Sequence, residues 1–278
     1  MNVIVVILPF MLLSLASGSR FVMPWMCLER CNDTAQSIDL QLASLRVNAS
    51  RIFTAASFED YNLGPDSTLV KNDLTQVAPL IKDMGLQTWA MVSSYPYPPQ
   101  FLQWMRQVFA EPQPFIQSCL AAAAEEKLTG WNIDWEPTTA GEVTADDAAA
   151  YAAFLQTFSQ AMHAAGVLVS VDVATWSPIW DIPAIAATEV DFMATMNTYT
   201  ANTTTWLRQL DAAVAAIPQN KLVVGLECDQ ADVGSLSEEA LQARFAALDA
   251  NRVRGIGLWR MPVPDVWWPY LEGFAKAG

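Results

Sequence analysis

The chain has 278 residues, of which 53% are hydrophobic and 16% are charged, so we expect a large buried core and no extended disorder. Its 15 basic and 29 acidic residues give a formal net charge of −14. This balance argues against nucleic acid and anionic membranes as partners, because both require clustered Lys and Arg side chains.

The N-terminal segment has the pattern of a secretory signal peptide. An unbroken apolar run covers Val3 to Leu13, and small residues follow from Ser14 to Ser19. The run is shorter than the roughly 20 residues that cross a bilayer. We therefore predict a signal peptide over 1–19 and a mature domain over 20–278. The protein is expected to be secreted, with a lysosomal or vacuolar lumen as the alternative.

Strand-like and helix-like segments alternate through the rest of the chain. The expected strands cover 21–28, 51–58, 86–94, 128–136, 167–176, 190–198, 221–227 and 255–259. A helical segment follows each strand. The first ends near residue 47, the second covers 72–84, and the third is broken at Pro112 and Pro114. The later helices are expected over 145–165, 183–188, 204–216, 237–251 and 265–277. Eight strand–helix units predict a single (β/α)8 TIM barrel. The alternative is an open doubly wound sheet, but no Gly-rich phosphate loop follows the first strand.

The cysteines and sequons agree with an exported protein. Cys27 and Cys31 are close enough in sequence for a local disulfide in an oxidising compartment, whereas Cys119 and Cys228 are interpreted as small core residues. Candidate N-glycosylation sequons begin at Asn32, Asn48 and Asn202.

The chain has one histidine, His163, which lies near the expected end of a helix. We interpret it as a helix C-terminal residue rather than a ligand. Nothing in the sequence resembles a zinc ligand set, and we predict no metal and no cofactor. We also expect a monomer.

The fourth expected strand is the most informative stretch. Its side chains alternate between an apolar set, Trp131, Ile133 and Trp135, and a polar set, Asn132, Asp134 and Glu136. The two carboxylates of such a strand lie within about 7 Å of each other. A pair of this kind is useful mainly for acid–base or ion-stabilising chemistry. Because TIM-barrel active sites lie at the C-terminal ends of the strands, we place the site here.

Other polar and aromatic residues fall at comparable strand ends. Asp172 lies in the fifth strand, Tyr199 after the sixth and Glu227 at the end of the seventh. Aromatic faces stack well on sugar rings, and the same rim is expected to gather Trp25, Phe58, Tyr61, Tyr95, Tyr97, Trp176, Trp180 and Trp259.

These motifs resemble those of the family 18 glycoside hydrolases, the chitinases and their relatives. The family's strand-four signature is Asp-Gly-x-Asp-x-Asp-x-Glu, and the matching positions here are Thr129, Gly130, Asn132, Asp134 and Glu136. Further motifs similar to the di-N-acetylchitobiase branch are Asp172 to Pro178, Asp191 to Met193 with Met196, Lys221 to Gly225, and Arg254 to Trp259.

The resemblance implies a retaining mechanism in which the 2-acetamido oxygen of the substrate is the nucleophile. Glu136 would be the general acid, and Asp134 would orient the acetamido group and stabilise the cationic oxazolinium. Trp259 would form the floor under the reacting sugar. An ionised Asp134 should raise the pKa of Glu136 and keep it protonated. The expected partner is an oligosaccharide or glycan that contains N-acetylglucosamine.

The sequence departs from the family pattern at three positions. Thr129 replaces the first Asp of the signature, and Asn132 replaces the middle one. The amide of Asn132 can donate to Asp134, and we predict that it keeps Asp134 ionised. The family tyrosine that contacts the acetamido group is matched by Tyr199, which is displaced by one residue and needs a bulge to reach the same face. The remaining predicted substrate contacts are Asp172, Glu227, Trp176 and Tyr95.

Three alternatives stay open at this point. The protein could be an inactive chitinase-like carbohydrate-binding protein, although it retains Glu136. It could act on another neutral sugar, with the two carboxylates as a conventional nucleophile and acid. The carboxylates could also belong to a buried ion-pair network, which requires a basic partner such as Lys127 or Arg260.

Overall fold

The computed structural model describes residues 20–31, 34–49, 51–72, 76–138, 140–228 and 234–277. The predicted signal peptide lies outside these residues, as do the first two residues of the Asn32 sequon and the last residue of the Asn48 sequon. None of the helices in the described part of the chain combines the length and the apolar character that spanning a membrane requires.

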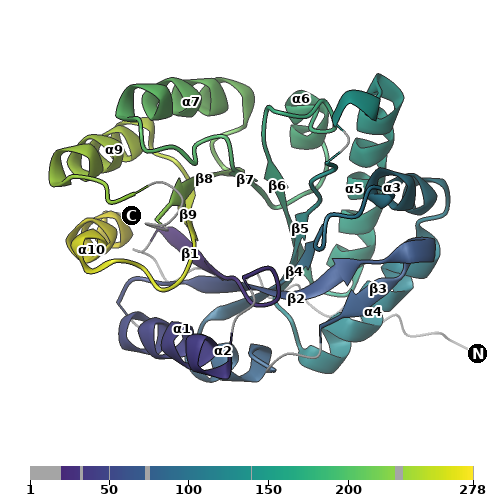
Figure 1. The fold of residues 1–278 in the computed structure, drawn as a ribbon, viewed down its shortest axis with the longest axis horizontal. Coiled ribbons are helices and arrows are strands. Elements are labelled where there is room, and N and C mark those ends of the chain that lie inside the picture. The colour runs from purple at the N-terminus through teal and green to yellow at the C-terminus, as the bar shows by residue number, and fades with distance from the viewer. Residues whose placement is uncertain are drawn as a thin grey trace, which may run out of the picture.

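Eight parallel strands close into a barrel, as Figure 1 shows. Their bounds are β1 Phe21–Met26, β2 Ala55–Leu63, β4 Gln87–Ser93, β5 Gly130–Asp134, β6 Leu168–Val173, β7 Phe192–Thr195, β8 Leu222–Glu227 and β9 Gly255–Trp259. β1 pairs in parallel with both β2 and β9, so the sheet has no free edge at its closing seam. This closure confirms the predicted TIM barrel and rules out the open doubly wound sheet.

Helices lie around the outside of the barrel between successive strands (Figure 1). They are α1 Ala35–Asn48, α2 Ala78–Asp83, α3 Phe101–Ala110, α4 Gln113–Glu126, α5 Ala145–Ala164, α6 Ile182–Ala186, α7 Thr203–Ala216, α9 Glu238–Asn251 and α10 Trp268–Lys276. Short 3-10 turns cover Pro65–Ser67, Ala140–Glu142 and Asp265–Trp267. Pro112 separates α3 from α4, as the sequence predicted.

The largest differences from prediction lie around β2. This strand runs to Leu63, five residues beyond its expected end, and the short strand β3, Leu69–Lys71, pairs with it in an antiparallel hairpin. The expected helix over 72–84 is reduced to α2, whose first turn contains Pro79. Proline fixes φ and is tolerated in the first turn of a helix, so it marks the start of α2 rather than its middle.

The barrel interior is filled by large side chains that need glycine on the neighbouring strand. A Cβ atom at Gly130 would lie 2.5 Å from the Trp89 ring, and one at Gly257 would lie 2.1 Å from the Trp25 ring. The two rings therefore close the interior below the C-terminal ends of the strands. The predicted disulfide between Cys27 and Cys31 is present, directly after β1.

Candidate active site

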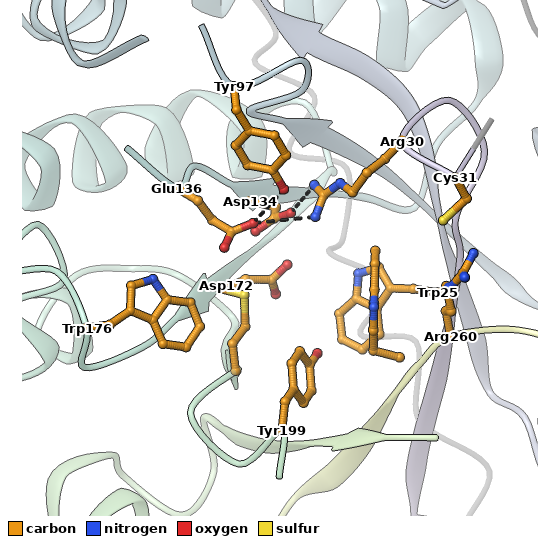
Figure 2. A pocket seen from close by; sticks show the side chains of 12 residues that line it. Trp25, Arg30, Cys31, Tyr97, Asp134, Glu136, Asp172, Trp176, Tyr199 and Arg260 are labelled. Atoms are coloured by element: carbon orange, nitrogen blue, oxygen red, sulfur yellow. Dashed lines mark hydrogen bonds and ion pairs between the residues drawn. The ribbon is translucent and has the colours of Figure 1, made fainter. Parts of the chain in front are cut away.

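A pocket of about 350 Å³ opens at the C-terminal ends of the strands. It is lined by Trp25, Arg30, Cys31, Tyr97, Asp134, Glu136, Asp172, Trp176, Met196, Tyr199, Trp259 and Arg260. Figure 2 shows carboxylates, aromatic rings and the Arg30 guanidinium group around this space, with Arg260 further out. The volume lies within the usual range of small-molecule sites.

Asp134 and Glu136 face the pocket from the end of β5, whereas Trp135 between them faces away. The Trp135 ring is buried and stacks on Phe154 of α5, with ring centroids 5.2 Å apart. Alternation along the strand thus separates an outward packing residue from two inward acids, as the sequence predicted. Ser94 holds the end of the strand, because its hydroxyl donates to the Asp134 carbonyl and accepts from the Glu136 amide.

The environment of Glu136 favours its protonated form. Burial, followed by the charge of Asp134, raises the pKa of Glu136 to about 7, while Arg30 and Tyr97 lower it by smaller amounts. The sequence predicted the direction and named Asp134 as the cause, but burial contributes more. A carboxyl group with this pKa can both hold a proton near neutral pH and release it, as a general acid must.

Arg30 contacts both carboxylates, and the sequence did not point to it. Its Nη2 donates to Asp134 Oδ2 at 2.7 Å, and its Nη1 donates to Glu136 Oε1 at 3.4 Å (Figure 2). The ion-pair network that the sequence left open is therefore present, but its cation is neither Lys127 nor Arg260. Arg30 comes from the turn between β1 and α1, 104 residues before Asp134 and 106 before Glu136.

Glu59 of β2 anchors the turn that carries Arg30. Its Oε2 accepts from the backbone amides of Leu28 and Arg30, at 3.3 and 3.0 Å, and its Oε1 accepts from Arg30 Nε at 3.2 Å. The Glu59 side chain is fully buried. The sequence analysis did not predict a role for Glu59 either, because no motif or regular spacing connects it with the other acidic residues of the site.

Asn132 does not interact with Asp134 in the expected way. Its Nδ2 donates to Ser170 Oγ and to Asp172 Oδ1, and its Oδ1 accepts from Trp25 Nε1 at 2.8 Å. The prediction that the Asn132 amide donates to Asp134 is therefore corrected. The reason is geometric, because Asn132 lies one layer deeper in the barrel, where its partners come from the adjacent strand β6 and from β1 across the interior.

Tyr199 reaches the pocket without a bulge in β7. The strand ends at Thr195, and a turn closed by the Tyr199 amide and the Met196 carbonyl reverses the chain. A Cβ atom at Gly225 would lie 2.7 Å from the Tyr199 ring, so glycine in β8 makes room for it. The turn after β7, rather than a bulge within the strand, thus brings Tyr199 to the pocket despite its displacement by one residue in the motif.

The other predicted residues divide into two groups. Asp172, Trp176 and Trp259 line the pocket with Tyr199, and Trp176 is 52% exposed, across the pocket from Arg30 in Figure 2. Tyr95 and Glu227 do not line it: Tyr95 packs edge-on against Tyr97, and Glu227 is buried at the end of β8.

Tyr95 and Tyr97 were both expected at the rim, and only Tyr97 lines the pocket. Its hydroxyl donates to Glu136 Oε1 at 3.2 Å, and its ring lies against the Arg30 guanidinium with 5.3 Å between Cζ and the ring centroid. The turn after β4 carries both tyrosines, and residues in a turn do not alternate regularly. The sequence could name the turn but not which tyrosine faces inward.

The remaining sequence predictions concern residues outside the pocket. Cys119 and Cys228 are buried, as expected of small core residues. His163 lies in the last turn of α5, where its Nε2 is 2.9 Å from Asp191 Oδ2. Of the sequons, Asn202 is exposed and caps the N-terminus of α7.

The sequence matches no protein-family model and no curated protein. Solved structures with a similar fold include the spore cortex-lytic enzyme SleL of Bacillus megaterium, with a TM-score of 0.76 and 14% identity over 93% of this chain and 75% of that one. A class V chitinase of Pseudomonas fluorescens has a TM-score of 0.74 and 15% identity, over 92% and 99% of the two chains. A chitinase of Chromobacterium violaceum has a TM-score of 0.73 and 14% identity, over 91% and 98%. At these identities the likeness establishes the fold.

Proposed function

We propose that this protein is a chitinase-like glycoside hydrolase that cleaves β-linked N-acetylglucosamine in chitin-type oligosaccharides or N-glycan cores. One observation carries the proposal: a partly buried glutamic acid, whose pKa is raised to about 7, lies beside an aspartate at the mouth of a TIM barrel. Solved structures with the same fold are named as chitinases and a spore cortex-lytic enzyme, which supports the reaction class.

In the proposed reaction Glu136 donates its proton to the glycosidic oxygen as the bond to the leaving sugar breaks. Tyr97 and Arg30 contact only Oε1 of this carboxyl group among the interactions described, which favours Oε2 as the oxygen that carries the proton. The same residue, once ionised, accepts a proton from the water that completes hydrolysis.

Asp134 is suited to hold the acetamido group of the substrate. Its Oδ2 is bound to Arg30, but its Oδ1 is buried and has no hydrogen-bond partner among the described residues. An unpaired buried acceptor is costly unless a ligand satisfies it, and an acetamide N–H is a donor of the right kind. The acetamide oxygen is then directed at the anomeric carbon, with Tyr199 and Trp259 lining the same space.

The protein is further proposed to act outside the cytosol. The Cys27–Cys31 disulfide supports an oxidising compartment, and Asn202 offers an exposed glycan acceptor. The resemblance of several motifs to the di-N-acetylchitobiase branch is the basis for proposing an oligosaccharide as the substrate.

The experiment measures turnover of fluorogenic chitobiosides and chitotriosides. We expect the wild type to cleave them, and Glu136→Gln to lose at least about a thousandfold in kcat while it still binds the sugar. Glu111→Gln is the matched control, because Glu111 is exposed and lies outside the pocket. Full activity of Glu136→Gln would refute the role of this residue as the acid.

A second substrate separates substrate-assisted chemistry from a conventional pair of carboxylates. In this analogue a hydroxyl replaces each acetamido group of the chitobioside. Substrate-assisted hydrolysis requires the acetamide oxygen and should fail on the analogue, whereas a conventional nucleophile and acid should cleave both. Equal rates on the two substrates would therefore favour the conventional pair.

One observation favours a second candidate function, carbohydrate binding without hydrolysis. Arg30 binds Asp134 and Glu136 together, which occupies one oxygen of each carboxylate. In this candidate the cation serves to hold Glu136 in its ionised form, which cannot donate a proton to a glycosidic oxygen. Binding of chito-oligosaccharides by calorimetry without any turnover would support this candidate over the hydrolase.

A further inference from the structure

The turn that carries Arg30 is closed at both ends. The Cys27–Cys31 disulfide joins the residues on either side of Leu28, Glu29 and Arg30. Glu59, which belongs to β2, accepts hydrogen bonds from two backbone amides of this ring, those of Leu28 and Arg30, and from the Arg30 side chain. The backbone of the turn and the first part of the arginine side chain are therefore fixed before the guanidinium group reaches the pocket.

The guanidinium group itself is bound on its edges and on its faces. Besides Glu59, its edges contact Asp134, Glu136 and Ser93, the last at 3.1 Å. Its Cζ lies 5.3 Å from the ring centroid of Tyr97 and 5.3 Å from that of Trp259. A planar cation held in this way fits arginine but not lysine, which lacks the fork of donors and the flat faces.

Arg30 is also the cation that directly contacts Glu136 among the described residues. The other titratable groups around Glu136 are the carboxyl groups of Asp134 and Asp172 and the phenols of Tyr97 and Tyr199. Arg260 lines the same pocket. Without Arg30, the carboxyl groups of Asp134 and Glu136 would face each other and Asp172 without the cation that contacts both of them among the described residues.

We propose that Arg30, held in place by the Cys27–Cys31 disulfide, fixes the two carboxylates of β5 relative to each other and sets the pH range in which Glu136 works. Arg30 is thus a positioning residue, and the part of this inference that concerns reaction rate rests on the proposed function. In this proposal the disulfide positions a residue of the pocket, in addition to any effect it has on the stability of the fold.

The direction of the effect follows from the charges. A cation beside a carboxyl group stabilises the ionised form, and Arg30 lowers the pKa of Glu136 against the opposing effects of burial and Asp134. Removal of the cation should therefore raise the pKa of Glu136. Because the acid works only when protonated, the falling limb of the kcat/KM profile should move to higher pH.

The first test compares Arg30→Met and Arg30→Lys with the wild type. Arg51→Met is the control, because Arg51 forms an exposed ion pair with Glu272 outside the pocket. The Glu136 carboxyl is titrated by 13C NMR in protein labelled at glutamate. We expect its midpoint to rise by about 1–3 pH units in Arg30→Met, by less in Arg30→Lys, and not in Arg51→Met. An unchanged midpoint in folded Arg30→Met overturns the proposal.

The second test breaks the disulfide. Dithiothreitol supplies two electrons and two protons, so the bond between the two sulfurs breaks, two thiols form, and the reductant closes to its cyclic disulfide. We expect the Glu136 midpoint to rise on reduction in the wild type, and to rise equally in the Cys27→Ser/Cys31→Ser variant without reductant. In Arg30→Met, reduction should leave the midpoint unchanged. A reduced wild type with an unchanged midpoint overturns the tethering role.

The titration tests the role of Arg30 independently of the proposed hydrolase activity, because the measurement requires no turnover of substrate. If the wild type cleaves no glycan but the midpoint moves as expected, the hydrolase proposal fails and the role of Arg30 stands. If the wild type cleaves chitobiosides and the midpoint stays, the role of Arg30 fails alone. If Arg30→Met does not fold by circular dichroism, Arg30→Lys and the double serine variant still decide the question.

Discussion

Asp172 is a buried carboxyl group whose surroundings favour its neutral form. Burial, with the charges of Asp134 and Glu136, raises its pKa well above the usual range, against the hydrogen bond from Asn132. A neutral carboxyl group is both a donor and an acceptor, so Asp172 can accept from Asn132 Nδ2 and still donate into the pocket. Its role thus differs from that of an orienting carboxylate.

Asp172→Asn is therefore expected to increase stability. The folded protein binds a proton at Asp172 that the unfolded chain releases above a pKa of about 3.9, so folding stability at this site falls as pH rises above that value. Asparagine keeps the shape and needs no proton. Urea unfolding of both proteins between pH 4 and 7 should show a gain for the variant that grows with pH.

The matched control for this comparison is Asp146→Asn, because Asp146 is exposed in the first turn of α5. Its stability difference from the wild type should not grow over the same range. A loss of stability in Asp172→Asn that increases with pH would mean that Asp172 is ionised in the folded protein.

The sequence predicted the lining of the pocket best for the acids at the ends of β5 and β6. Asp134, Glu136 and Asp172 follow from strand alternation combined with the barrel rule. Arg30 and Tyr97 lie in turns, where side-chain direction depends on the disulfide, on Glu59 and on local backbone geometry. Both residues contact acids that lie far away in the sequence, and no periodic pattern in a single sequence indicates such contacts.

At the level of elements, β5 joins the site to the layer of helices behind it. Trp135 is buried against α5, where its ring stacks on Phe154 and lies 6.0 Å from Tyr151. Phe115 of α4 contacts the same ring edge-on. This aromatic cluster holds the strand end from the outside, while Ser94 and Arg30 hold it from the inside.

Replacement of Trp135 by alanine should therefore be costly for stability. Removal of a fully buried tryptophan leaves a large cavity, and such changes cost about 3–5 kcal/mol. The free energy of unfolding in urea measures the loss. Trp176→Ala is the control, because this residue is half exposed at the pocket rim, and surface changes of this kind stay within about 0.5 kcal/mol. Similar losses for both variants would contradict the assignment of Trp135 to the core.

The accuracy of the predicted elements also has a physical reason. β9 has the predicted bounds, 255–259, because Gly255 and the chain after Trp259 interrupt the apolar run at both ends. The end of β2 was missed because Glu59 and Asp60 interrupt the apolar pattern, although both are buried. Buried acids are rare, so a pattern-based prediction ends a strand where they begin.

At the scale of the whole molecule, the closed barrel and the net charge are independent properties. The barrel follows from eight apolar strands and needs no particular charge. The excess of 29 acidic over 15 basic residues adds a repulsion that the folded chain must overcome. Several surface cations are already paired, as in Arg51 with Glu272 and Arg106 with Asp147, so they cannot offset the rest of the acidic surface.

Salt should accordingly stabilise the folded protein at neutral pH. Screening weakens exposed like-charge repulsion, and the Debye length falls to about 10 Å at 0.1 M. We expect the melting temperature to rise by about 2–4 °C between 20 and 200 mM NaCl at pH 7, which corresponds to about 1 kcal/mol for a domain of this size. Near pH 4.3, the isoelectric point of the sequence, the net charge vanishes and the gain should disappear. A melting temperature that falls with salt at pH 7 would mean that the exposed ion pairs outweigh the acidic repulsion.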